Sequence, residues 1–343
     1  MNRLRIPGIA VLAGVLAVLG VWAQAQAPLG LQLAEAANRF LATLTPEQKA
    51  KATFAFDDKE RFNWNFVPLQ DKQRRATRKG IPLEELDQEQ REAALELLKL
   101  ATSPVGYEAA RTIMSLEGIL AELEKNGAMV RNPNWYFVSI FGTPDKSAKW
   151  GFRIEGHHLS LNLTLENGEV IGTTPCVFAA NPATVKNGPR KGLRAIPDCD
   201  DLAQKLARSL DEEQKKLAIL PKAFPEIDQK TTKAPLGEPV GIPGAKLTEA
   251  QRGILTDLIK AYTDRFAAPI AQAEYRRATA NGLDQVYFAY TGGFEQGQKH
   301  TYRVHGPNFA IQFLNEQSDS AGNPANHIHS AWRRLPSDFG LAQ

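Results

Sequence analysis

The six histidines of the chain are its clearest candidates for chemistry, because they gather in and just after two similar stretches. Lys149–Leu163 reads KWGFRIEGHHLSLNL, and Lys299–Phe313, which begins 150 residues later, reads KHTYRVHGPNFAIQF. Imidazoles gathered in this way indicate metal binding or proton transfer. The six residues are His157, His158, His300, His305, His327 and His329.

A His-x-His pair is the strongest local signal for a metal site. If Asn326–Trp332 is a strand, His327 and His329 share one of its faces. A third histidine from a neighbouring strand would complete three nitrogen ligands and leave one position open, which suits zinc, copper or iron. We expect His158 to be this third ligand, because it heads a polar row that continues with Asn162.

Other assignments of the histidines stay open at this stage. His305 and His300 are alternatives for the third ligand, and the alternation of His157 with leucines favours a structural, hydrogen-bonded role for it. The sequence is also compatible with a metal-free polar cleft and with purely structural histidines. No carboxylate is clearly positioned as a ligand, although Glu108 and Glu117 share a side of a predicted helix and could reach inward.

A second group of side chains, basic, aromatic and polar, is expected to line the approach to the histidines. Such residues would select a small polar or anionic molecule. The alternative for the aromatic segment Phe54–Pro68 is that it packs against the body of the protein. The expected ligand-binding residues are Arg61, Trp64, Arg78, Asn162 and Arg333.

The elements around the histidines occur twice. Gly80–Leu100 and Gly241–Ala261 both open with Gly-Ile-Pro and continue as an amphipathic helix, and a second helix follows each. A strand, a long histidine-bearing strand and a third strand then follow in both copies. We therefore predict an α+β fold, an internal duplication of a helix pair plus a three-stranded antiparallel meander with pseudo-two-fold symmetry and a cleft between the halves.

The predicted strands of this unit have matching positions in the two copies. The first pair is Trp135–Gly142 and Gln285–Gly293, and the third pair is Val170–Ala180 and Asn326–Trp332. A single charged helix is expected over Asp198–Leu220. The predicted organisation is a signal peptide at 1–27, an N-terminal helical and irregular segment at 28–79, repeat 1 with a docking helix at 80–220, a proline-rich connection at 221–240, and repeat 2 at 241–343.

The first 27 residues resemble a secretory signal peptide. Arg3 and Arg5 precede the apolar run Ile9–Val21, and Ala25-Gln26-Ala27 offers a cleavage pattern; an uncleaved anchor is the alternative. We expect an exported protein, periplasmic or secreted, with no membrane span after cleavage. Removing this segment lowers the formal net charge from +3 to +1, which gives no electrostatic basis for nucleic-acid binding.

Two function classes follow. The first is a metal-dependent enzyme that acts on a small polar substrate by hydrolysis or oxidation; the second is a non-catalytic periplasmic protein that binds a small ligand or delivers a metal. A structural or partner-binding domain is a third possibility. Gly-x-Ser-x-Gly, Walker, His-Glu-x-x-His and Cys-x-x-Cys motifs are absent. Cys176 and Cys199 could form a disulfide worth about 3 kcal/mol or remain free thiols.

The C-terminal motif His-Ile-His-Ser-Ala-Trp-Arg, followed by Asp338-Phe339-Gly340, resembles the end of the domain of unknown function 3500 family of bacterial and fungal proteins. The resemblance extends over nearly the whole mature chain and implies an exported protein with the same histidine cluster. Because the family has no described activity, the resemblance does not indicate a reaction. Further matching motifs are Glu155–Asn162, Arg61–Trp64, Arg78-Lys79-Gly80, Gly106-Tyr107 and Glu117.

Overall fold

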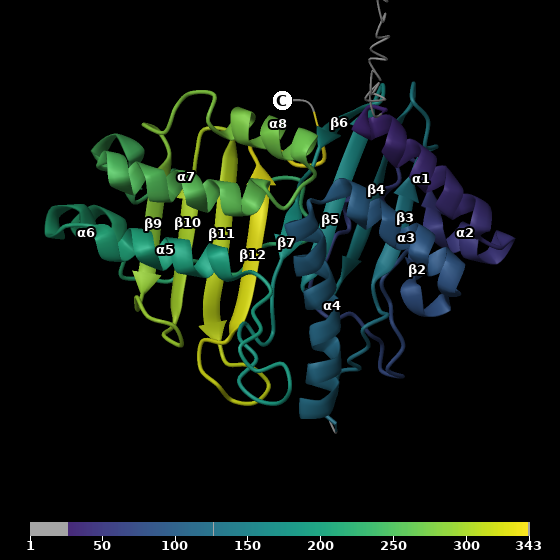
Figure 1. Ribbon diagram of the computed structural model, residues 1–343, viewed down its shortest axis with the longest axis horizontal. Coiled ribbons are helices and arrows are strands. Elements are labelled where there is room, and N and C mark those ends of the chain that lie inside the picture. The colour runs from purple at the N-terminus through teal and green to yellow at the C-terminus, as the bar shows by residue number, and fades with distance from the viewer. Residues whose placement is uncertain (1–26, 126, 342–343) are drawn as a thin grey trace, which may run out of the picture.

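A computed structural model describes residues 27–125 and 127–341, so nearly all of the predicted signal peptide lies outside the described residues. The described chain has an α+β fold, in which helices cover one face of a mixed sheet (Figure 1). Helices α1 to α4 lie over β3–β5, and α5 to α8 lie over β9–β12 (Figure 1). The α+β prediction is therefore confirmed.

The helices begin largely where the sequence signals place them. Thr45, Asp87 and Thr248 each cap a helix whose third residue is a glutamine that returns the bond, a complete capping box. The α-helices are α1 (Leu29–Thr43), α2 (Pro46–Ala52), α3 (Gln88–Ala101), α4 (Pro104–Leu123), α5 (Pro197–Ser209), α6 (Glu212–Ala218), α7 (Glu249–Thr263) and α8 (Ala268–Ala278). Three short 3₁₀ helices are η1 (Lys59–Phe62), η2 (Leu83–Glu85) and η3 (Gly244–Lys246).

The strands form one sheet in the order β1-β3-β4-β5-β7-β12-β11-β10-β9-β8, with β2 beside β3 and β6 beside β5. Only the β1–β3 pairing is parallel among the described strands. The strands are β1 (Thr53–Phe54), β2 (Ile81–Pro82), β3 (Phe137–Phe141), β4 (Lys149–Gly156), β5 (Leu159–Glu166), β6 (Glu169–Gly172), β7 (Cys176–Phe178), β8 (Ile242–Pro243), β9 (Tyr287–Gly292), β10 (His300–His305), β11 (Phe309–Gln317) and β12 (His327–Arg334).

The prediction of one long strand through Lys149–Leu163 is wrong. This stretch is the hairpin β4–β5, and His157-His158 is its two-residue turn. His158 has φ 64°, a left-handed conformation that tight turns require. The face assignment made for a continuous strand therefore does not apply to His158, although Ser160 and Asn162 do share one face of β5.

Two other predicted elements are each divided in the structure. The third strand of the first half is split into β6 and β7, because Pro175 has no N–H to continue the ladder. The helix expected over Asp198–Leu220 is split into α5 and α6, because the Asp211 side chain accepts a hydrogen bond from the Gln214 N–H and starts a new helix.

The main core lies between the helices and the front face of the sheet, and a smaller cluster around Trp64 and Phe66 covers the back face. Cys176 and Cys199 are buried free thiols, and burial raises the pKa of Cys176 to about 12. None of the described helices combines the length and apolar character needed to cross a bilayer. The pairing of β7 with β12 joins the two halves into one sheet.

Candidate metal centre

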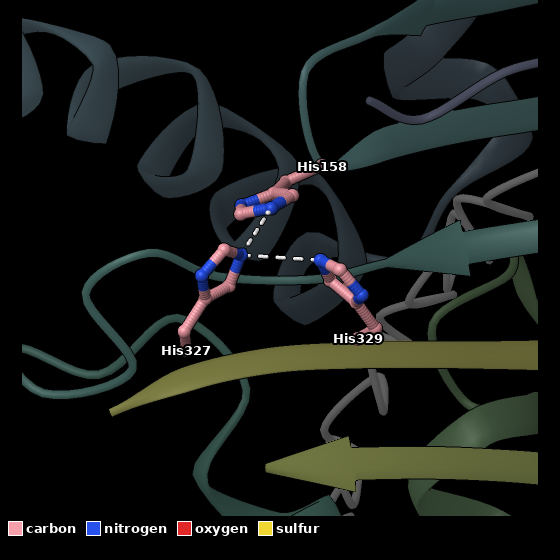
Figure 2. Close-up of side chains that lie close together, drawn as sticks. All are labelled: His158, His327 and His329. Atoms are coloured by element: carbon pink, nitrogen blue, oxygen red, sulfur yellow. Dashed lines mark hydrogen bonds between the residues drawn. The ribbon is translucent and has the colours of Figure 1, made fainter. Parts of the chain in front are cut away.

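His158 and the pair His327 and His329 are far apart in sequence but converge at the N-terminal end of β12 (Figure 2). His327 Nε2 lies 3.0 Å from His158 Nε2 and 3.1 Å from His329 Nε2. In a tetrahedral site with metal–nitrogen bonds of about 2.0–2.1 Å, neighbouring nitrogens lie about 3.3 Å apart. All three possible ligand atoms lie within 4.8 Å of one another, so small movements of the rings would fit them around one ion.

Hydrogen bonds at the outer side of the rings determine which nitrogen carries the lone pair. His329 Nδ1 donates to Glu226 Oε2 at 2.7 Å, so the neutral ring presents a bare Nε2 to the cluster. A hydrogen bond with the Ser318 backbone raises the pKa of His327, although burial lowers it more. The His327 Nε2 atom lies within hydrogen-bond distance of both other rings. A metal ion among the three rings would take up the lone pairs of these nitrogens.

The strand and the turn position the three ligands in different ways. On β12, His327 and His329 alternate with Ile328, which is buried on the other face. His158 is held through its backbone: its N–H donates to the Phe66 carbonyl at 2.7 Å, and its carbonyl accepts from the Ala179 N–H at 2.9 Å. The prediction that these three histidines lie together is confirmed.

The environment keeps the His158 and His327 imidazoles neutral. Burial lowers the pKa of His158 well below 6.5, and the neighbouring His157 lowers it further. Burial and the nearby His329 lower the pKa of His327 to about 3. A neutral imidazole is the form that binds a metal, so the protein favours the ligand form over the protonated form at physiological pH.

Charged side chains surround His157 in the His157-His158 turn. The His157 ring lies with its centroid 3.8 Å from that of His158. Its Nδ1 is hydrogen-bonded to the buried Glu117 carboxylate, and the Arg131 guanidinium lies 3.2 Å from the same nitrogen. Arg131 in turn pairs with Glu124. His157 therefore has the hydrogen-bonded role expected of it, and it packs directly against a proposed ligand.

The histidine pair of β12 forms part of the wall of a cavity of about 280 Å³. Glu226 lines the same cavity and also accepts a hydrogen bond from the Ile227 N–H at 2.8 Å. Burial alone would raise the pKa of Glu226, but the hydrogen bond and charge of His329 together with the Ile227 N–H outweigh burial, and the pKa is lowered. The carboxylate is therefore charged and orients His329 toward the cluster.

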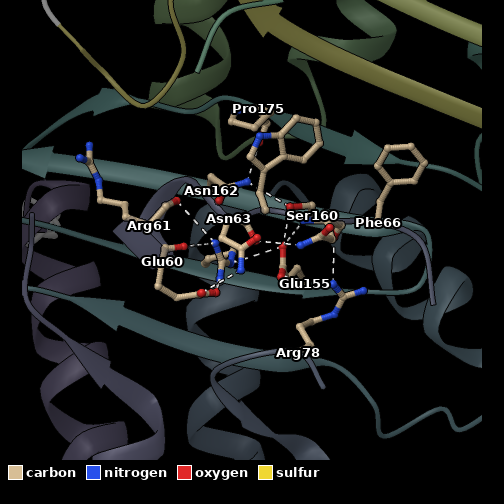
Figure 3. A network of polar contacts seen from close by, with 12 residues as sticks. Glu60, Arg61, Asn63, Phe66, Arg78, Glu155, Ser160, Asn162 and Pro175 are labelled. Carbon is tan, nitrogen blue, oxygen red and sulfur yellow. Dashed lines mark hydrogen bonds and ion pairs between the residues drawn. The ribbon is translucent and has the colours of Figure 1, made fainter. Parts of the chain in front are cut away.

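The five predicted ligand-binding side chains are all buried and bound within the protein, and none of them lines this cavity. Arg78 forms an ion pair with Glu155 at 3.3 Å, in a network that also contains Ser160 and Asn162 (Figure 3). Asn162 donates to the Pro175 carbonyl at 2.8 Å (Figure 3). Arg78 alone of the five borders a larger groove of about 690 Å³.

The other three predicted residues hold covering segments on the back face of the sheet. Arg61 donates to the Phe339 carbonyl at 2.9 Å, and burial lowers its pKa to about 10. Trp64 Nε1 donates to the Thr231 carbonyl at 2.9 Å. The Arg333 guanidinium pairs with Asp338 at 2.6 Å and lies over the Trp64 ring.

The alternative histidines lie elsewhere. His300 Nε2 is 2.9 Å from Asp200 Oδ1, and His305 is buried at the end of β10. Sequence reasoning missed Glu226, which lies in the proline-rich connection without any local pattern. It also missed the backbone contact of Phe66, whose ring edge packs on His329 at 5.0 Å between centroids.

The comparisons with known proteins identify a family but no activity. No curated protein and no solved structure matches the chain. The family model described as "Protein of unknown function (DUF3500)" matches residues 30–341, which include all three histidines of the cluster. The chain therefore belongs to the DUF3500 family.

Proposed function

We propose that the protein binds one transition-metal ion through the Nε2 atoms of His158, His327 and His329. The observation that carries this proposal is the convergence of three imidazole nitrogens, with His327 Nε2 lying 3.0 Å from His158 Nε2 and 3.1 Å from His329 Nε2. Among the described residues this is the single group of three or more histidine, cysteine or acidic side chains with ligand geometry. Three nitrogen ligands suit zinc, copper or iron.

The cavity beside His327 and His329 favours an enzyme that acts on a small polar molecule. A metal held by three neutral ligands keeps its charge, so it can polarise a substrate or acidify a bound water when loaded. The residues of the chain supply orientation: Glu226 fixes His329, and Glu117 holds His157 against His158. Hydrolysis and oxidation are both compatible with such a site.

A non-catalytic binding or delivery protein is the competing function. It would exchange its metal rapidly with a chelator and would leave a mixture of small metabolites unchanged. An enzyme would retain its metal and consume a component of that mixture. Chelator exchange followed by metabolite profiling therefore separates the two.

We also propose the organisation and location predicted from the sequence. Residues 80–220 and 241–343 would be two copies of one unit, supported by the matching order β2-η2-α3-α4-β3-β4-β5 and β8-η3-α7-α8-β9-β10-β11. The metal would lie between the halves, since His158 belongs to the first and β12 to the second. Export rests on the signal-like sequence of residues 1–27.

Elemental analysis of the untagged protein, purified without chelators, tests the metal centre. We expect about one equivalent of a single transition metal in the wild type, and none when His327→Ala and His329→Ala are combined. His305→Ala is the matched control, because it removes a buried histidine from the same sheet outside the cluster. Stoichiometric metal in the folded double variant would refute the proposal, and so would a wild type that binds no added zinc, copper or iron.

A further inference from the structure

The cavity that leads to the histidine cluster has an acidic wall. Its charged lining residues are Glu226 and Glu316, and neither lysine nor arginine lines it. The apolar part of the wall consists of Phe224, Pro225 and Leu314. An anionic substrate would approach two carboxylates here, whereas a cation would be attracted.

The register of β11 places the acidic residue beside the histidines: alternation from Leu314 puts Glu316 on the face of His329, and a bulge adds Gln317 to that face. Leu314 pairs with His329 and Gln317 pairs with His327, so β11 has one more residue than β12 between these two points. Regular alternation would put Glu316 and Gln317 on opposite faces, but both line the cavity. Bulges often redirect a side chain toward a site in this way.

The two carboxylates are not equivalent. Glu226 is engaged by the His329 ring and by the Ile227 N–H. Glu316 is half-buried and has neither a hydrogen-bond nor an ion-pair partner in the part of the chain that the structure describes. Of the two carboxylates, Glu316 is therefore the one that can form an ion pair with a ligand.

The nearest guanidinium groups are committed to other partners. Arg303 packs on the Phe224 ring, 4.4 Å from its centroid, and donates to the Leu236 carbonyl. Arg131 is paired with Glu124 beside His157. Neither of them reaches the cavity wall, so neither provides a clamp for a carboxylate or a phosphate.

We propose that this cavity binds a small organic cation, with a protonated amine at Glu316 and an apolar portion against Phe224 and Leu314. The inference deepens the proposed function and rests on it, because it names the class of substrate that reaches the metal between His327 and His329. The volume of about 280 Å³ limits the ligand to a small molecule.

Three probes of similar size and different charge test the inference: isobutylamine, which is protonated at neutral pH, isobutyramide and isobutyrate. Calorimetric titration into cobalt-loaded protein should rank isobutylamine first and isobutyrate last. Glu316→Gln should weaken isobutylamine binding about fivefold and leave cobalt content unchanged. Glu166→Gln is the matched control, because Glu166 stands 150 residues earlier, at the end of β5, and pairs with Lys149.

The same titrations into metal-free protein separate this inference from the proposed function. Protein that takes up neither cobalt nor added zinc, copper or iron refutes the metal centre, but a preference for isobutylamine that depends on Glu316 would still support the cation site. Tightest binding of isobutyrate, equal weakening by both glutamine variants, or no binding of any probe would overturn the cation site even if cobalt binds.

Discussion

The β4–β5 and β10–β11 turns occupy corresponding positions 150 residues apart, yet of these two turns the first alone contributes a histidine to the cluster. The turn is His157-His158 in the first hairpin and Gly306-Pro307-Asn308 in the second. In both, the carbonyl of the last turn residue accepts a backbone N–H from a later segment, Ala179 in the first hairpin and Leu335 in the second. The backbone of the two turns is therefore docked in the same way.

The side chains of these turns have different roles. His158 has a left-handed backbone, and its ring faces the histidine pair of β12. Asn308 donates to the Arg277 carbonyl at 2.6 Å, and the Arg277 guanidinium donates to the Asn308 carbonyl at 2.6 Å. Both hairpins therefore hold their turn against a later segment of the chain. Whether a turn contributes to the histidine cluster depends on its side chain and on the element that lies opposite.

Replacing His158 with asparagine gives the first turn the last residue of the second turn, so it should remove the contribution of the first turn to metal binding. Asparagine tolerates the left-handed conformation that His158 adopts, so His158→Asn removes the ligand with little backbone strain. We expect metal affinity to fall by more than about 100-fold, while the thermal midpoint of the metal-free protein changes little. Competition against a chelator of known affinity measures the loss. An affinity within a few-fold of the wild type would exclude His158 as a ligand.

Removing the Glu226 carboxylate, which bonds to His329, should have the next largest effect on metal affinity. Glu226→Ala removes the group that orients His329, and we expect metal affinity to fall by about 10- to 100-fold. The comparison variant is Asp228→Ala, two residues along the same connection. If chelator competition gives equal affinities for both variants, Glu226 does not orient the ligand.

His158, in the first turn, should also contribute to the way the free energy of unfolding changes with pH. The folded-state pKa of His158 and of His327 lies below 6.5, so the unfolded chain takes up protons that the folded chain does not. The stability of the metal-free protein is therefore highest above pH 6.5 and falls as the pH drops below it. Each such histidine should lower the free energy of unfolding by about 2 kcal/mol between pH 6.5 and 5.0.

Denaturant unfolding of metal-free protein at pH 7.5 and 5.0 measures this loss. The wild type should lose about 1–2 kcal/mol more than His158→Asn over the same interval. Equal losses in the two proteins would mean that His158 is not kept neutral by the fold.

The reciprocal change in the second turn should have the smallest effect. Asn308→His breaks the hydrogen bond to the Arg277 carbonyl and should cost about 1 kcal/mol of unfolding free energy. It should not add a second equivalent of metal, because Arg277 and not a histidine pair lies opposite. Elemental analysis and denaturant unfolding test both statements. A second equivalent of metal would show that the hairpin alone determines the site.

The sequence predicted the histidine cluster better than the backbone that carries it. The His-x-His alternation of β12 was sufficient to pair His327 with His329, and the equivalent positions of the two predicted meanders indicated His158 as the third histidine. The turn at His157-His158 was missed because neither residue is one of the Gly, Pro, Asn or Asp residues that usually mark a turn. The corresponding Gly306-Pro307-Asn308 does carry turn signals, and applying the 150-residue offset to it would have located the turn.

Glu226 could not be predicted by such reasoning. Its contact with His329 spans 103 residues, and the segment around it has no periodic pattern that places a side chain. The buried positions of Arg61, Arg78 and Arg333 were equally out of reach, since each depends on partners contributed by the tertiary structure. Their predicted role in ligand binding stays a prediction.

The pairing of β7 with β12 has a consequence for how the protein matures. His158 and His327 lie 169 residues apart in sequence, on opposite sides of the seam where the two halves join. Before β12 docks on β7, the first half carries one of the three nitrogens and the second half carries the other two. A metal ion bound at all three would therefore gain its full ligand set only once the halves have met, and it would then stabilise the contact between them.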